Sequence, residues 1–313
     1  MDNLYNTFER FREINVYQRV DSMHPLDLYV GIDDLSRWTL LLICDTKPHN
    51  LTSSKMIVTR VGHREDNRWS ISLSLKDDTY AEMFVLFCGD IIDSSRSIRD
   101  KKKAARFITN RYNEWRNMLA NAKNELLSGE EAKGLLGEMY FLDLNLMDHF
   151  GAEKAALSWM GPKGAHQDYI VDDTWYEIKT VSSGREEIRI SSIEQLDCEN
   201  RGKLVIVYAD KTSLTNERAI NLNVLYRRLM LRFSDDDAKA EFCNMLLRYG
   251  YYPRREYETE EYTYEVKGIS YYSVPNTFPC LRRSGLPYSV VKAEYYLSLP
   301  AIQEYREDDI VWN

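Results

Sequence analysis

Two carboxylates and a lysine are spaced so that a hairpin would bring them together. Residues 166–183, HQDYIVDDTWYEIKTVSS, alternate polar and apolar on both sides of an acidic DD turn. Pairing across a turn of either two or four residues sets Asp168 opposite Glu177, and opposed Cβ atoms lie about 5 Å apart. Because side chains alternate along a strand, Lys179 shares the face of Glu177. The sequence therefore predicts Asp168, Glu177 and Lys179 on one face of a hairpin.

Two interpretations of this hairpin compete. Opposed carboxylates repel each other, and a divalent cation held between them would remove that cost, since hard oxygen ligands suit Mg²⁺ or Mn²⁺. On an exposed hairpin, however, solvent screening makes the same repulsion small. The tripeptide Glu-x-Lys does not decide between them, because Glu-x-Lys or Asp-x-Lys recurs along the chain.

Two neighbouring segments could add polar groups to such a site. In GLLGEMYFLDLNL, Glu138 stands in an apolar helical pattern with Gly134 and Gly137, and helical glycines allow another element to approach closely. Glu138 then lies either on the solvent-facing stripe of that helix or in the site. In RISSIEQLD, Gln195 either joins the site or forms a capping box with Ser192.

The elements that would position these residues divide the chain into four regions, with a mixed α+β composition overall. Residues 1–93 predict a helix followed by a β-rich domain whose short strands include AEMFVLFC, and 94–130 predict a long connecting helix. Residues 131–211 run helix, strands, helix, strand, which indicates an α/β core. Residues 212–313 predict a mainly helical region with a mixed, aromatic end.

Composition excludes several classes of protein. A net charge of −8 is unlike a generic nucleic-acid binder, although local basic patches can still bind phosphates. Five cysteines without a CxxC and five dispersed histidines argue against a zinc site and against disulfides. The longest apolar runs, WTLLLIC and MFVLFC, are too short to span a membrane, and the first residues have no signal-peptide core. We expect a cytoplasmic protein that does not engage the membrane.

The strings GLLGEMYFL, WMGP, QDY, YEIKT and RISSIEQL together resemble the PD-(D/E)XK nuclease superfamily, and in particular an uncharacterised bacterial family grouped with it. The resemblance is most specific over residues 131–210 and looser on both flanks. It implies a restriction-endonuclease-like αβββαβ core. One position departs from the motif, because Gln167 stands where the superfamily has proline before Asp168. The Asp, Glu and Lys positions are all filled.

The resemblance implies a role for each candidate residue. The implied ligands of Mg²⁺ or Mn²⁺ are the carboxylates of Asp168, Glu177 and Glu138 and the backbone carbonyl of Ile178, with Glu138 alternatively holding a water. Lys179 would activate the attacking water and stabilise charge on the phosphate. Gln195 would steady the substrate or Lys179.

The function that the resemblance implies is metal-dependent endonucleolytic cleavage of DNA, in bacterial defence against phage or foreign DNA. Partners would be DNA and the ATPase or other subunits of a multi-gene defence system, and cutting both strands with one site per chain would favour a homodimer. A second reading is a DNA-binding or scaffolding subunit of such a complex with little cutting activity. A third is an unrelated mixed α/β protein with an ordinary hairpin.

DNA would need local basic patches, and each of these competes with a reading as ordinary solvated surface. RRLMLR has the strongest case, because its cations fall on one helical stripe. The candidates are Lys101, Lys102, Lys103 and Arg106; Arg227, Arg228 and Arg232; and Arg282 with Arg283.

Overall fold

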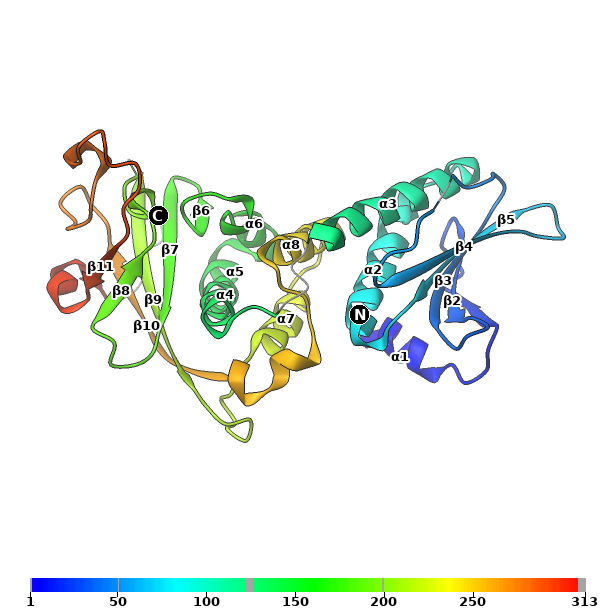
Figure 1. The fold of residues 1–313 in the computed structure, drawn as a ribbon, viewed down its shortest axis with the longest axis horizontal. Coiled ribbons are helices and arrows are strands. Elements are labelled where there is room, and N and C mark those ends of the chain that lie inside the picture. The colour runs from blue at the N-terminus through cyan, green and yellow to red at the C-terminus, as the bar shows by residue number, and fades with distance from the viewer. Residues whose placement is uncertain (1, 50, 122–125, 199, 309–313) are drawn as a thin grey trace. The chain divides into compact units, whose positions relative to one another are not determined.

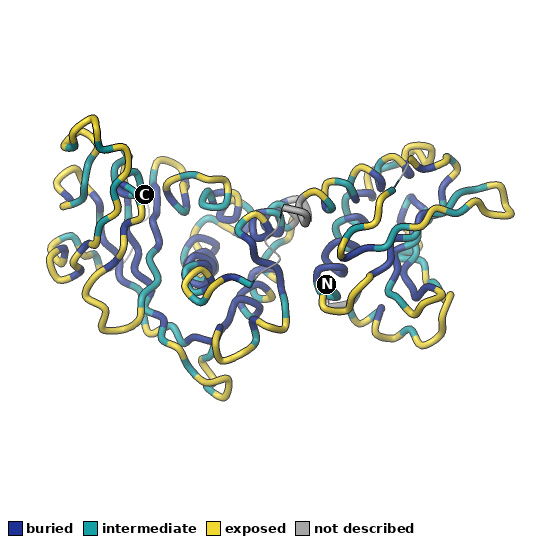
Figure 2. The backbone as a smooth tube through the Cα atoms, in the orientation of Figure 1, coloured by how far each residue is buried: buried dark blue, intermediate teal, exposed yellow. Residues whose placement is uncertain are grey.

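The computed structural model describes residues 2–49, 51–121, 126–198 and 200–308. The chain folds as two compact units, Met1–Lys123 and Asn124–Asn313 (Figure 1). In both units the buried residues are concentrated along the strands and helices, and the connecting turns are mostly exposed (Figure 2). No helix in the described ranges is long and apolar enough to cross a membrane.

In its described residues the first unit is an antiparallel sheet with three α-helices. Its strand order is β1-β2-β3-β5-β4, and every pairing is antiparallel, as the alternating short strands predicted. The elements are α1 (Asp2–Arg10), β1 (Val16–Arg19), β2 (Asp27–Ile32), β3 (Trp38–Cys44), β4 (Ile57–His63), β5 (Trp69–Leu75), α2 (Ala81–Ser94) and α3 (Lys101–Asn121).

One expectation for this unit was wrong, and a second differs in its bounds. The segment AEMFVLFC forms helix α2 and not a strand, and its buried side chains run without a break from Met83 to Cys88. A continuous apolar run of this length fits a buried helix as well as a buried strand. The long helix predicted over residues 94–130 is present as α3, which begins at Lys101 and packs against α2 and β3 of the same unit. Residues 122–125 of the predicted span lie outside the described residues.

The second unit contains the segments with the candidate residues. Its main sheet has the order β12-β10-β9-β7-β6, with β7 and β9 parallel and the other pairs antiparallel. The elements are α4 (Gly129–Phe141), α5 (Met147–Phe150), α6 (Ala152–Leu157), β6 (Tyr169–Val171), β7 (Thr174–Val181), β8 (Glu187–Ile190), β9 (Arg201–Lys211), α7 (Leu222–Met230), α8 (Asp236–Tyr249), β10 (Tyr264–Ser273), β11 (Tyr295–Ser298) and β12 (Arg306–Glu307).

The predicted α/β class with helices and several sheets is confirmed. The strands, however, are distributed between the sheets differently from the expected layout. Strand β8 pairs with β11 in a separate two-stranded sheet, and the element before β9 is a single 3₁₀ turn, Ile193–Gln195. Strand β10, from the region expected to be mainly helical, lies directly beside β9 in the main sheet. Trp175, Leu204 and Tyr272 belong to the apolar core that joins β7, β9 and β10.

Candidate active site

The hairpin has the predicted register. Tyr169 pairs with Tyr176 and Val171 with Thr174, so the same register carried one residue further sets Asp168 opposite Glu177. Asp172 adopts a left-handed conformation with φ of 49°, which short acidic side chains tolerate in tight turns. Local sequence therefore fixes which side chains share a face.

Asp168 is held at the edge of β7 by main-chain hydrogen bonds. Its Oδ2 accepts a hydrogen bond from the Ile178 amide at 2.7 Å, and its carbonyl accepts one from the Met160 amide at 2.7 Å. A Cβ added to Gly161 would lie 3.4 Å from Asp168 Oδ1 and 3.7 Å from Glu138 Oε2. The glycine therefore lets the chain pass close to both carboxylates.

Lys179 connects Glu177 with Gln195. Its Nζ donates to Glu177 Oε1 at 2.7 Å and to Gln195 Oε1 at 3.2 Å. Gln195 Oε1 also accepts from the Ser191 amide at 2.8 Å, while Ser192 makes no side-chain cap. Gln195 thus steadies the lysine, and the capping-box alternative does not hold.

Glu138 faces the protein interior and not solvent. Helix α4 begins with a capping box between Ser128 and Glu131, and it packs so tightly on β7 that a Cβ on Gly137 would overlap the Thr180 hydroxyl. Glu138 is only 7% exposed. The close packing expected of the helical glycines is therefore present at Gly137.

Two aromatic side chains engage the Glu138 carboxylate. Trp159 Nε1 donates to Oε2 at 2.7 Å, and the Tyr249 hydroxyl donates to Oε1 at 3.4 Å. The Trp159 ring stacks near those of Tyr169 and Tyr249, with centroids 6.3 and 6.2 Å away. Glu138 is thus held in one orientation by donors from two different segments.

The three carboxylates share a poorly solvated, negatively charged environment. Burial raises the pKa of Glu177 to about 8, repulsion from Asp168 adds to the rise, and Lys179 opposes it. Burial also raises the pKa of Asp168 to about 6. The pKa of Glu138 lies well above its usual range because of burial first and the Asp168 charge second. Pairs of carboxyl groups with raised pKa values are typical of catalytic and metal-binding sites.

The residues around Glu177 fit a divalent cation. Glu177 Oε2 is buried and has no hydrogen-bond partner among the described residues, so it has a free lone pair inside the protein. Asp168 and the Ile178 carbonyl add hard oxygen donors of the kind that Mg²⁺ and Mn²⁺ prefer. Within the described ranges, no three Asp, Glu, His or Cys side chains are grouped closely enough to hold a metal ion together. An ion here would therefore need main-chain oxygen and water to complete its coordination.

Three supporting residues were not assigned a role from sequence. Trp159 lies in the WMGP string and Tyr249 at the end of α8, and both contact Glu138. Gln167 is 8% exposed, and its Nε2 donates to the Glu194 carbonyl at 2.6 Å, so it ties the start of β6 to the turn that carries Gln195. The sequence offered one signal for Gln167, because it occupies the position before Asp168 where the PD-(D/E)XK motif has proline.

The arginines of RRLMLR are paired with acidic residues. Arg227 Nη1 lies 3.0 Å from Glu258, and Arg228 forms an ion pair with Asp143. Arg232 lies 2.9 Å from Asp143 and 2.5 Å from Asp148. These cations balance carboxylates of their own unit, including the buried Asp143, and this weakens their case as a phosphate-binding stripe.

The other basic candidates differ among themselves. In the first unit Lys102 and Lys103 are exposed, and Lys101 lies 3.4 Å from Asp27. In the second unit Arg282 pairs with Asp197 at 3.2 Å, and Arg283 is exposed.

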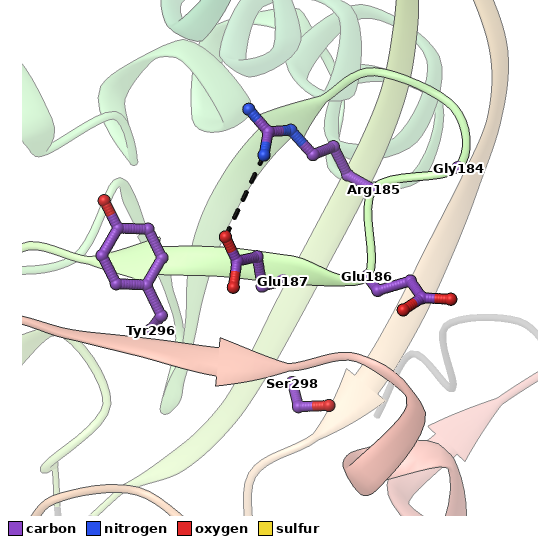
Figure 3. A pocket seen from close by; sticks show the side chains of 6 residues that line it. All are labelled: Gly184, Arg185, Glu186, Glu187, Tyr296 and Ser298. Atoms are coloured by element: carbon purple, nitrogen blue, oxygen red, sulfur yellow. Dashed lines mark ion pairs between the residues drawn. The ribbon is translucent and has the colours of Figure 1, made fainter.

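An open cavity of about 480 Å³ lies at the turn between β7 and β8 and against β11. It is lined by Gly184, Arg185, Glu186, Glu187, Tyr296 and Ser298, and none of the five candidate residues takes part. Figure 3 shows Arg185 extended toward Glu187. Arg185 Nη1 lies 4.0 Å from Glu187 Oε1.

Comparison with known proteins identifies the family of the chain. The sequence matches the family described as "Putative PD-(D/E)XK family member, (DUF4420)" over residues 2–300, so the match takes in both units and not only residues 131–210. No curated protein and no solved structure matches the chain. The chain belongs to this PD-(D/E)XK family.

Proposed function

We propose that the protein is a divalent-metal-dependent endonuclease that hydrolyses phosphodiester bonds in DNA. The observation that carries the proposal is the arrangement around Glu177. One carboxylate oxygen is buried without a partner among the described residues, and the other bonds the Lys179 ammonium. Asp168 is fixed beside them by the Ile178 amide. Family membership points to the same chemistry.

Each residue has a task that its position supports. Asp168 and Glu177, with the Ile178 carbonyl, would hold Mg²⁺ or Mn²⁺. Such an ion promotes ionisation of water and offsets charge on the phosphoryl oxygens. Lys179, restrained by Gln195 at 3.2 Å, presents its ammonium to the phosphate and to the attacking water.

Glu138 would support Asp168 and Glu177 rather than bind the metal as strongly as they do, because its carboxylate already accepts hydrogen bonds from Trp159 and Tyr249. Burial and the Asp168 charge raise its pKa, so Glu138 holds a proton more readily than an ordinary glutamate. In its protonated form it can donate a hydrogen bond to a water or to a phosphate oxygen. A metal ion binds the deprotonated carboxylates, so it competes with protons for Glu177. Metal binding, and with it the DNA-cutting activity, should therefore rise as the pH increases toward the Glu177 pKa of about 8.

We assign this activity to bacterial defence against phage or foreign DNA, with DNA as substrate and other subunits of a defence system as partners. The support for this part of the proposal is the family resemblance. A DNA-binding or scaffolding role without cutting is a separate outcome of the experiment below.

A cleavage assay tests the proposal. The full chain is incubated with supercoiled, linear and single-stranded DNA in Mg²⁺, Mn²⁺ or EDTA. We expect metal-dependent nicking or cutting of circular DNA that Asp168→Ala and Lys179→Ala abolish. Asp173→Ala, on the exposed turn of the same hairpin, is the matched control and should cut like the wild type. Cutting that survives in both site variants would refute the site, and metal-dependent binding without cutting would favour the scaffolding role.

A calorimetric titration with Mn²⁺ tests the ligands without relying on activity. Glu177→Gln keeps the side-chain shape but removes the charge, so it should lose most of the affinity. Lys179→Ala removes a competing cation from Glu177 and should keep or increase that affinity. Equal affinity in the wild type and Glu177→Gln would exclude Glu177 as a ligand.

A further inference from the structure

A basic and aromatic segment lies between β10 and β11 in the second unit. Residues 281–293, LRRSGLPYSVVKA, contain three cations and no acidic residue, in a chain whose net charge is −8. We call this segment the basic loop. Its local charge is opposite in sign to that of the whole molecule, so it could attract a polyanion that the rest of the surface repels.

The basic loop has a defined conformation that holds its tip outward. The Val290 amide donates to the Pro287 carbonyl at 2.9 Å, which closes a turn, and the Arg283 guanidinium donates across the loop to the Val290 carbonyl. Tyr288, inside that turn, is 97% exposed, and Val291 just after it is 84% exposed. An aromatic ring is thus presented to solvent on a hydrogen-bonded support.

Two of the loop's three charges are available to a ligand. Arg282 is paired with Asp197 at 3.2 Å, and Glu294, the next acidic residue, is held by Arg189 at 2.6 Å. Among the residues that the structure describes, Arg283 and Lys292 form no ion pair with a carboxylate. The pKa of the Glu294 carboxyl is lowered first by its hydrogen bond from Arg189, and Lys292 is close enough for its charge to lower it further. Arg283 keeps donors beyond the one that bonds the Val290 carbonyl.

The basic loop is attached to the turn that carries Gln195. The Arg283 amide donates to Asp197 Oδ2 at 2.8 Å, and Cys280 Sγ donates to the Leu196 carbonyl at 3.7 Å. Gln195, immediately before these acceptors, bonds Lys179. A ligand on the loop therefore lies on a support that is continuous with the candidate site.

We propose that the basic loop binds the nucleic acid on which the candidate site acts, with Arg283 and Lys292 on phosphates and Tyr288 stacked on an unpaired base. The identity of the ligand rests on the proposed function. Exposed aromatic side chains combined with cations are the usual means of gripping single strands. Exposed cations alone contribute phosphate contacts that do not depend on sequence.

Fluorescence anisotropy in EDTA measures this binding without cleavage. Full-length protein is titrated against single-stranded and duplex oligonucleotides at several salt concentrations. We expect Tyr288→Ala to weaken single-strand binding by about 5- to 150-fold, while Tyr288→Phe retains it. Lys292→Gln should lower the salt slope by about 1 for both DNA forms. Lys211→Gln, exposed at the far end of β9, is the matched control and should behave as the wild type.

The outcomes separate the loop from the nuclease. Normal binding by Tyr288→Ala and Lys292→Gln, or an equal loss in Lys211→Gln, would overturn the role of the basic loop while leaving the proposed cutting activity intact. Loss of binding in the loop variants, with no cutting by wild-type protein in Mg²⁺ or Mn²⁺, would uphold the loop and refute the nuclease. No binding by the wild type to either DNA would overturn the loop proposal directly.

Discussion

The close packing of α4 on β7 makes Gly137 a sensitive position. Gly137→Ala would place a methyl group onto the Thr180 hydroxyl. The same methyl group would lie 3.0 Å from the Thr180 Cβ and 3.2 Å from the Thr180 Cγ2. Rotation of the threonine can move the hydroxyl, but it leaves the Thr180 Cβ 3.0 Å from the new methyl group, so a tight contact remains. Helix α4 must then shift away from β7, and Glu138 moves with it.

The size of the effect follows from two opposing terms. Alanine favours a helix over glycine by about 1 kcal/mol, and inserting a methyl group into a packed interface typically costs about 1–3 kcal/mol, occasionally more. With backbone-proximal atoms in the way, we expect a net loss of about 2 kcal/mol. At Gly134, one turn earlier in the same helix, the nearest atom is the Tyr249 hydroxyl at an ordinary 3.7 Å. Gly134→Ala should therefore gain about 0.5–1 kcal/mol.

Urea unfolding followed by tryptophan fluorescence and circular dichroism tests both variants. Because the chain has two compact units, Gly137→Ala should move only the transition of the second unit. Adding Thr180→Ala should restore part of the loss, since the hydroxyl it removes is buried without a partner among the described residues. Wild-type stability in Gly137→Ala, or an equal loss in Gly134→Ala, would refute the packing argument.

Three further predictions concern the site. The pKa of Glu177 rises from 4.5 to about 8 on folding, so the folded state holds the proton more tightly. In EDTA the Tm should fall as the pH rises from 4.5 to about 8. Glu177→Gln should make the Tm depend less on pH over this range, and the same pH dependence as in the wild type would contradict the prediction. Trp159→Phe deprives Glu138 of a buried donor and should cost about 1–3 kcal/mol in urea unfolding; full stability would show that the bond contributes little. Gln167→Leu leaves the Glu194 carbonyl without its donor and should slow DNA cutting at unchanged Mn²⁺ affinity, whereas lost affinity would place Gln167 with the ligands.

Features set by neighbouring residues could be predicted from sequence. The register that opposes Asp168 and Glu177 needs only the period of two and a short turn, and it is confirmed. The polarity of Glu138 was visible, but its inward direction depends on which face of α4 is covered. Sequence therefore left two alternatives at this residue, and tertiary packing selected one.

Features that depend on distant partners could not be predicted. Tyr249 comes from α8, and nothing near it in sequence marks it as a neighbour of Glu138. The cations of RRLMLR were visible, whereas their pairing with Asp143 and Glu258 depends on the fold. Helix α2 was mistaken for a strand because a continuous apolar run carries no period that separates the two.

The position of β10 has a consequence for any shortened form of the protein. Strand β9 is buried through its middle and has β7 on one side and β10 on the other. A chain ending near residue 211 would leave the eleven residues of β9 with an unpaired edge, open to strand addition from other molecules. It would also lack Tyr249 and the basic loop. The smallest soluble fragment of the second unit should therefore extend past β10, and fragments limited to the motif-bearing segment should aggregate.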